Sequence, residues 1–444
     1  MFRGVGPLHA PRTTSKARRI IRRSRGPTTT IDDLPNELLL YIGAQFTNLD
    51  RNWDLANLAL VSKRWRPIAQ EWLLKVPRFN ITFIDRYMWQ LGHRPELLSQ
   101  VKSLEIWSTS DGRVQRDERG RSKSEYVPIP APDRITQDKE FMDQCEAIIK
   151  YFTRERDGPF RYNSRRWRRA LVQDVVPALF GTLLCALPHL RELKLGDAWL
   201  LDFPIFASTH SAGAQLRSVP PKGWKHDFLL DALRPLLPQL TLLEVPADMT
   251  TMYYPGSARG FFDFTRFENL TEIGVTMRAI QGFVPFGISR PWTLPNPTEM
   301  FPPTLELLKI SEATHYSANF VKDVCLAKKT AGLPLLRRIE VYHVETLDNT
   351  IDDASLVHCL SPIDDVHVAC EGAEIALYLY FPPCSMRTWE SGGGSPWRLR
   401  NEPKALRSGE VACWRKDMGP LGVLEKMGKR VEVEWDADGD AVMV

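Results

Sequence analysis

The chain has 444 residues, 43% of them hydrophobic and 25% charged, a composition typical of globular proteins rather than disordered or fibrous ones. Its length exceeds one typical domain and allows a large core. The formal net charge of +4 is unevenly placed, because residues 1–31 carry eight Arg or Lys and no acidic residue. The remainder has 50 basic and 54 acidic residues, and this balance argues against nucleic acid as a partner of the folded body.

Residues 1–30 are rich in Arg, Ser, Thr and Pro and poor in large apolar side chains, which predicts a disordered basic arm. The cluster Arg18, Arg19, Arg22, Arg23 and Arg25 fits a nuclear import signal or a phosphate-binding patch. An acid-free segment with Arg and Ser also fits a mitochondrial transit peptide, and an inert solvated tail is a further interpretation.

We find no apolar run of membrane-spanning length and no secretory signal. We therefore expect a cytoplasmic or nuclear protein that binds no membrane.

The chemical motifs of common enzyme classes are missing from the sequence. The seven cysteines are odd in number and form no C-x-x-C pair, which indicates reduced thiols rather than a metal site. There is no P-loop, H-E-x-x-H or G-x-S-x-G motif. Asp436, Asp438 and Asp440 resemble the start of a calcium loop, but the Glu that such a loop requires does not follow. The sequence predicts a protein that is not an enzyme and has no cofactor or metal; an enzyme site assembled from dispersed residues is the alternative.

Three short amphipathic helices are predicted near the N-terminus. Thr30, Asp32 and Asp33 can cap a helix start, and Pro35 suits its first turn. Three apolar stripes at helical spacing follow, the third in a helix that begins at Pro67: Leu34, Leu38, Tyr41 and Ile42; Leu55, Leu58, Val61 and Trp65; and Ile68, Trp72 and Leu73. Helices this short make a small core and leave apolar residues over, which predicts a surface that binds a partner.

This segment reads Leu34-Pro35-x-Glu37-Leu38-x-x-x-Ile42 and then Asp54-Leu55-x-x-Leu58-x-Leu60-Val61-Ser62-Lys63-Arg64-Trp65-Arg66-x-Ile68-Ala69. The pattern covers about a tenth of the chain and resembles the F-box family, in its fungal form. The resemblance implies an F-box domain over residues 31–80 that binds the Skp-type adaptor of a cullin-RING ubiquitin ligase. It also implies an adaptor-binding surface, in which apolar anchors enter a groove of the partner: Leu34, Pro35, Leu38, Ile42, Leu60, Val61 and Trp65.

The rest of the chain contains a repeated pattern, apolar-x-x-apolar-x-apolar, which predicts a strand each time it occurs. It is found at Val101/Leu104/Ile106, Leu190/Leu193/Leu195, Leu240/Leu243/Val245, Leu270/Ile273/Val275, Leu305/Leu308/Ile310, Leu336/Ile339/Val341 and Ile363/Val366/Val368. Several copies follow a Pro and a polar residue, and helical apolar patterns precede some of them at 167–187, 228–237 and 321–327. The predicted order is helix, turn, strand, repeated.

That order resembles leucine-rich repeats, although the expected Asn after each strand is missing. The resemblance implies an α/β fold in which an irregular solenoid of leucine-rich-repeat type occupies residues 81–444. A polar insertion is expected at about 108–140, a flexible loop at 391–395 and a last, capping strand at 431–435. An ordinary α/β domain with buried strands is the alternative fold.

Together these features predict an F-box substrate receptor that recruits an unknown protein for ubiquitination. Alternate strand residues face away from the core, which places the substrate contacts at positions expected to be exposed: Glu192, Lys194, Glu244, Glu272, Glu306, Arg338 and Glu340. This set leans acidic, so we expect a partner with basic or polar groups; plain solvation of the same residues is the competing interpretation. A scaffold that uses the F-box without ubiquitination is the alternative function within the same class.

Overall fold

The computed structural model describes a discontinuous set of residues, namely 31–46, 51–107, 135–153, 160–173, 175–195, 203, 205, 227–245, 264–277, 280, 296–313, 317–343, 363–380, 433–435 and 441–443. The predicted basic arm, most of the 108–140 insertion and the 391–395 loop lie outside the described residues. The cysteines Cys359, Cys384 and Cys413 lie outside them as well.

The three predicted N-terminal helices are present. A 3-10 turn, η1 (Ile31–Asp33), precedes α1 (Asn36–Ala44), α2 (Arg51–Val61) and α3 (Trp65–Lys75). Leu39, Trp65 and Ile68 form their buried core. The third helix begins at Trp65 and not at Pro67. The Ser62 hydroxyl accepts a hydrogen bond from the Trp65 backbone N–H at 3.2 Å, which satisfies one of the N–H groups that have no partner within the helix. Pro67 therefore lies within the first turn, where its missing N–H costs nothing.

An eight-stranded parallel sheet follows the three helices. Its strands are β1 (Arg78–Asn80), β2 (Ser103–Trp107), β3 (Glu192–Lys194), β4 (Leu242–Glu244), β5 (Glu272–Thr276), β6 (Leu307–Ala313), β7 (Arg338–His343) and β8 (Ala376–Tyr380). They lie in the sheet in the same order as in the sequence. A parallel sheet without any change of strand order is the arrangement of a solenoid, in which each repeat contacts the next.

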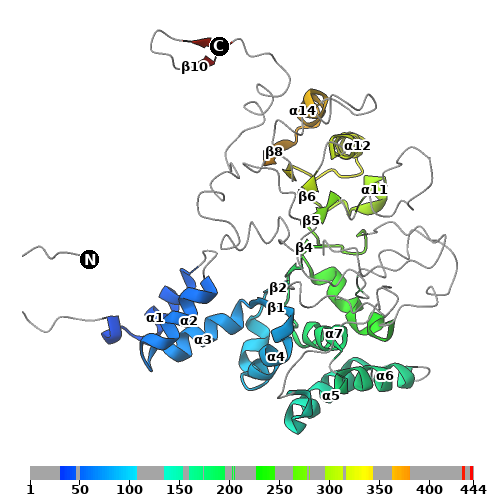
Figure 1. Ribbon diagram of the computed structural model, residues 1–444. Helices are drawn as coiled ribbons and strands as arrows, with labels where there is room; N and C mark the ends of the chain where they lie inside the picture. The colour runs from blue at the N-terminus through cyan, green and yellow to red at the C-terminus, as the bar shows by residue number, and fades with distance from the viewer. Residues whose placement is uncertain are drawn as a thin grey trace, which may run out of the picture.

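Helices connect the strands along one side of the sheet (Figure 1). The α-helices between β1 and β4 are α4 (Ile84–Gly92), α5 (Lys139–Thr153), α6 (Phe160–Val172), α7 (Val176–Ala186) and α9 (Leu230–Leu233). Those between β5 and β8 are α11 (Pro297–Met300), α12 (Ser317–Lys329) and α14 (Ile363–Glu371). Short 3-10 turns complete the connections: η2 (Ile81–Phe83), η3 (Pro95–Gln100), η5 (Ile135–Gln137), η6 (Asp227–Leu229) and η7 (Arg234–Gln239).

The core lies between the strands and these helices. Six of the seven predicted apolar patterns place their central residue fully inside it: Leu104, Leu193, Leu243, Ile273, Leu308 and Ile339. Trp167, Phe180 and Phe320 enter the same core from the helices. Because strand side chains alternate between faces, the residues on either side of each central position lie on the opposite face. We call that opposite face of the sheet the polar face.

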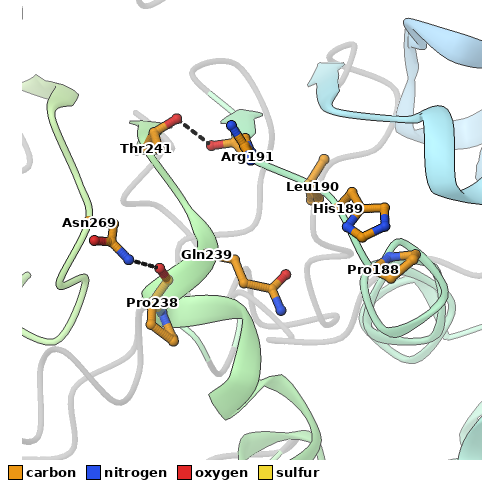
Figure 2. A pocket seen from close by; sticks show the side chains of 8 residues that line it. All are labelled: Pro188, His189, Leu190, Arg191, Pro238, Gln239, Thr241 and Asn269. Carbon is orange, nitrogen blue, oxygen red and sulfur yellow. Dashed lines mark hydrogen bonds between the residues drawn. The ribbon is translucent and has the colours of Figure 1, made fainter.

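A recurrent hydrogen-bond pattern links each repeat to the next just before the strands. The carbonyls of Lys102, Arg191, Thr241, Thr271 and Glu306 each accept two backbone N–H groups from the following repeat, at 2.8–3.2 Å. Side chains add to this link, because the Thr241 hydroxyl donates to the Arg191 carbonyl and the Asn269 amide donates to the Pro238 carbonyl (Figure 2). These turns border an open cleft of about 580 Å³. Neighbouring repeats are thus joined by Thr and Asn side chains that precede the strands. The Asn that leucine-rich repeats carry after each strand is missing from this chain.

Three sequence predictions need correction. The seventh pattern, Ile363/Val366/Val368, is not a strand but part of α14, in which Val366 is buried and Val368 is exposed; a short apolar run does not by itself distinguish a strand from a helical segment. The strand of that repeat is β8, whose pattern is broken by Glu374. Strand β1 was missed, although Val76, Phe79 and Ile81 have the required spacing.

The predicted helix over 167–187 and the capping strand also differ from the structure. The helix is divided into α6 and α7, and Pro177 stands at the start of α7, where proline is favoured. The expected last strand exists as β9 (Val433–Trp435), but it pairs antiparallel with β10 (Ala441–Met443) and not with the parallel sheet. Helix α5 begins at Lys139, inside the predicted insertion. The remaining arrangement, three helices followed by a parallel sheet of eight strands, is consistent with a solenoid of leucine-rich-repeat type.

Candidate adaptor-binding surface

Large apolar side chains are exposed on the first two helices. Leu60 is 78% exposed, Val61 is 70% exposed and Leu38 is 49% exposed. All three were predicted to contact a partner. Isolated apolar residues are common on protein surfaces, but several on one small helical unit mark a surface that another molecule covers. We call Leu38, Leu60 and Val61 the exposed anchors.

The other predicted contact residues differ in burial. Pro35 is exposed, whereas Leu34 and Ile42 are half-buried against the core of the three helices. Trp65 is only 2% exposed, so its side chain supports the surface from inside and has no area to offer a partner. The sequence could not separate these two roles, because the same motif supplies both the core and the contact surface.

Three further exposed apolar residues were not predicted to contact a partner: Ile31, Tyr41 and Trp53. Trp53 precedes Leu60 by seven residues and Val61 by eight, which places all three on one face of α2. On α1, Tyr41 follows Leu38 by three residues and shares its face. The helical period therefore contained the signal for Tyr41 and Trp53.

Arg64 joins the two halves of the sequence motif. Its guanidinium donates to the Leu34 carbonyl and to Asn36 Oδ1, the latter at 3.3 and 3.4 Å. Hydrogen bonds from a charged donor are stronger than neutral ones. The start of α1 is thereby held against the start of α3.

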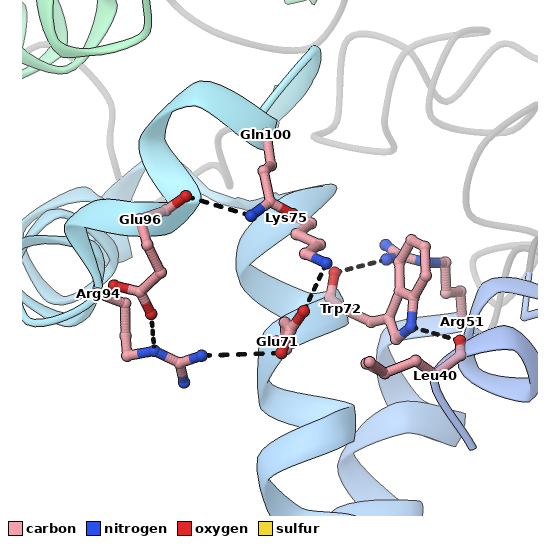
Figure 3. A network of polar contacts seen from close by, with 8 residues as sticks. All are labelled: Leu40, Arg51, Glu71, Trp72, Lys75, Arg94, Glu96 and Gln100. Carbon is pink, nitrogen blue, oxygen red and sulfur yellow. Dashed lines mark hydrogen bonds and ion pairs between the residues drawn. The ribbon is translucent and has the colours of Figure 1, made fainter. Parts of the chain in front are cut away.

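Trp72 and Arg51 hold the three helices together at their other end (Figure 3). The Trp72 indole N–H donates to the Leu40 carbonyl at 2.8 Å, and the ring lies against Gly43, where a Cβ atom would clash with it. The Arg51 guanidinium donates to the Trp72 and Val76 carbonyls at 2.7 Å each, which places a positive charge at the C-terminus of α3. Burial, with a smaller contribution from the nearby charge of Arg78, lowers the pKa of Arg51 to about 10.

The same region attaches the three helices to the sheet. The Asn52 amide donates to the carbonyl of Arg78 in β1, and the Tyr87 hydroxyl of α4 donates to the Leu74 carbonyl of α3 at 2.9 Å. Glu71 of α3 pairs with Lys75 at 2.5 Å and with Arg94 at 3.7 Å, and Arg94 also pairs with Glu96 in η3 at 2.5 Å. The exposed anchors are therefore fixed relative to the first strands of the sheet.

Most of the predicted substrate contacts come together on the polar face. In register, Glu192 lies beside Leu242, and Lys194 lies between Glu105 and Glu244. Four acid–base pairs form among the described residues of this face: Arg78 with Glu105 at 2.9 Å, Lys194 with Glu192 at 3.5 Å, Lys309 with Glu272, and Arg338 with Glu340 at 2.6 Å. Arg338 also lies over the Tyr378 ring, 4.2 Å from its centre. The acidic charges are thus balanced by neighbouring basic groups, and the expected acidic character of the face is much reduced.

Three of these residues are not placed as predicted. Glu244 is fully buried and Glu340 is only 6% exposed, although both were expected to be exposed. Glu340 also accepts a hydrogen bond from the Tyr342 hydroxyl at 2.7 Å. Glu306 precedes β6 and lies on the turn, where its carbonyl links two repeats. The side chains of Glu192 and Arg338 are 42% and 43% exposed, and these two remain accessible.

Basic side chains of α6 and a buried histidine have structural roles. In α6, Arg168 pairs with Glu146 at 2.7 Å and Arg166 lies over the Phe228 ring. His343 is buried, which lowers the pKa of its imidazole to about 3, so it is a neutral core residue.

Within the described ranges, no group of three His, Cys, Asp or Glu side chains could hold a metal ion. No single described helix is long and apolar enough to cross a membrane; only the bent pair Ser164–Val172 and Val176–Ala186 meets that test jointly.

Comparison with known families identifies the first of these units. Residues 31–75 match the F-box-like family. This range covers η1 and the three helices and ends at the last residue of α3. No curated protein and no solved structure shows significant similarity to the chain. The chain therefore carries an F-box-like domain at residues 31–75, followed by a region built on a parallel sheet of eight strands.

Proposed function

We propose that this protein is a substrate receptor of a cullin-RING ubiquitin ligase, in which the F-box-like domain binds the Skp-type adaptor. The observation that carries the proposal is the exposure of Leu38, Leu60 and Val61 within the matched domain. Their burial in a partner's groove removes apolar area from water and so stabilises the complex. Arg64 supports the proposal, since it positions the start of α1 relative to α3.

We propose that the parallel-sheet region is an irregular solenoid of leucine-rich-repeat type and binds a protein substrate. Among the predicted contacts, Glu192 and Arg338 are the positions that a partner can reach most readily. Lys194 and Glu272 are half-buried beside them. The protein acts without a catalytic site of its own, in the cytoplasm, the nucleus or both. The hydrogen bonds of Arg51, Asn52 and Tyr87 support this role, because a receptor must hold its substrate at a fixed position relative to the ligase.

Affinity purification with mass spectrometry tests this function in cells. We expect the full chain to co-purify the adaptor, a cullin and a RING protein. The double variant Leu38→Glu, Leu60→Glu should lose all three together and retain the substrates, which then accumulate on it. Gln70→Glu is the matched control, because Gln70 is exposed on the side of α3 opposite its buried residues. Recovery of the adaptor without any cullin would favour the scaffold function and contradict the receptor.

A further inference from the structure

Two cysteine side chains meet inside the helical layer of the last repeats. Cys325 of α12 and Cys370 of α14 have their sulfur atoms 3.4 Å apart, and each residue is almost fully buried. Both are free thiols. The other cysteines of the described ranges, Cys145 and Cys185, are also free and make no contact with another sulfur among the described residues.

The two thiols belong to neighbouring repeats. Helix α12 connects β6 to β7, and α14 connects β7 to β8. Since β8 is the last strand of the parallel sheet, its repeat has a described neighbour on one side only. Terminal repeats are the first to open in a solenoid, because fewer contacts hold them. A covalent bond between Cys325 and Cys370 would therefore act at the end of the described part of the array, and a small oxidant can reach the pair when that repeat opens.

The surroundings of the two sulfur atoms make them chemically unequal. The hydrogen bond from Cys370 lowers the pKa of Cys325, and the positive charges of Lys329 and Lys328 act in the same direction against the effect of burial. The same hydrogen bond, together with burial, raises the pKa of Cys370. Lys328 is held in place because its Nζ donates to the Leu336 and Glu374 carbonyls at 2.6 and 3.2 Å. By contrast, burial alone raises the pKa of Cys145, to about 12.

We propose that Cys325 and Cys370 form a reversible disulfide when the protein meets a peroxide, and that this bond fastens the last repeat to the one before it. The sulfur of Cys325 attacks one peroxide oxygen, the O–O bond breaks, and the departing hydroxide takes up a proton to leave as water. The sulfur of Cys370 then attacks the sulfenic acid formed on Cys325, which releases a second water. Two thiols and one hydrogen peroxide thus give one disulfide and two water molecules, and a dithiol reverses the reaction.

The geometry requires only a small movement. A disulfide has its sulfur atoms about 2.0 Å apart, so the present contact must shorten by about 1.4 Å. The bond would close a loop between residues 45 positions apart. Such a closure restricts the unfolded chain and raises stability. We expect the melting temperature of the oxidised protein to rise by roughly 5 °C or more.

The test uses the full chain and the two forms of the wild type. The reduced protein is exposed to hydrogen peroxide, its remaining thiols are alkylated, and the digest is mapped by mass spectrometry without reduction. We expect a linked pair of peptides containing Cys325 and Cys370, a higher melting temperature, and the loss of both after treatment with dithiothreitol. This comparison needs no substitution and therefore does not depend on a variant that folds.

Two variants provide the matched controls. Cys370→Ala should remove the linked peptides and the rise in melting temperature, whereas Cys145→Ala should leave both intact. The proposal fails if Cys325 and Cys370 stay alkylated as free thiols, if Cys325 is linked to another cysteine, or if it is oxidised to a sulfinic acid in the wild type. A disulfide that forms without any rise in melting temperature would overturn its role in fastening the last repeat. None of these outcomes bears on adaptor binding, which involves the opposite end of the sheet.

Discussion

Replacing Leu60 with Glu is expected to lower the affinity of the chain for a Skp-type adaptor by at least about 30-fold, or about 2 kcal/mol. Leu60 is 78% exposed, so in the free protein the substitution removes little packing and should change stability by no more than about 0.5 kcal/mol. In the complex, the same position would place an unpaired carboxylate in an apolar groove, which is unfavourable. Isothermal titration of the purified adaptor into each variant measures this difference.

Gln70→Glu provides the comparison, because it introduces the same charge at an exposed position of α3 that faces away from the core of the domain. It should bind the adaptor as tightly as the wild type does. Substitution at Leu34 is a less direct test, since its half-buried side chain packs against the core and its carbonyl binds Arg64. If Leu60→Glu and Gln70→Glu bound equally well, the exposed anchors would not form the adaptor surface.

The second large effect is expected in the sheet, at Glu340. Glu340→Lys should lower stability by about 3–5 kcal/mol, because it places a positive charge without an acidic partner at a buried position, next to the half-exposed Arg338. Glu340 is only 6% exposed and binds both Arg338 and the Tyr342 hydroxyl. Lys309 is its neighbour in β6, which adds further repulsion. For a chain of this length the melting temperature should fall by about 5 °C.

Glu192→Lys is the matched control for this charge reversal. Its side chain is 42% exposed and pairs with Lys194 at 3.5 Å, and ion pairs at such exposed positions contribute at most about 1 kcal/mol. Equal melting temperatures for the two variants would show that Glu340 is not held as described. The contrast also bears on substrate mapping, because a substrate lost from Glu340→Lys would reflect unfolding. A change at Glu192 or Arg338 is the informative test of recognition.

The F-box-like domain could be predicted in detail from the sequence because its determinants are local. Three apolar stripes at helical spacing specify the helices, and Ser62 accepts a hydrogen bond from the first backbone N–H of the third. Which residues of the motif are buried in the core and which are exposed to a partner could not be predicted in the same way. Trp65 and Leu60 are both apolar residues of one motif, yet the first is buried and the second exposed. That distinction depends on how α1 and α2 pack on α3, which is a tertiary property.

The apolar pattern predicted most strands of the sheet correctly but also predicted one strand that is a helix. The spacing of three apolar residues located β2 to β7, where a turn precedes each strand and positions its first residue. At Ile363 the same spacing belongs to α14, because a short apolar run does not by itself distinguish a strand from a helical segment. The burial of Glu340 and the pairing of Lys309 with Glu272 depend on the register between strands distant in sequence. No local pattern carries that information.

Co-expression of the full chain with a Skp-type adaptor tests the central claim most directly. Size-exclusion chromatography with light scattering should show a single 1:1 complex, and the backbone amides of α1 and α2 around Leu38, Leu60 and Val61 should exchange more slowly in it than in the free protein. Separate elution of the two proteins at micromolar concentration, with the three helices folded, would contradict the assignment of this surface to the adaptor.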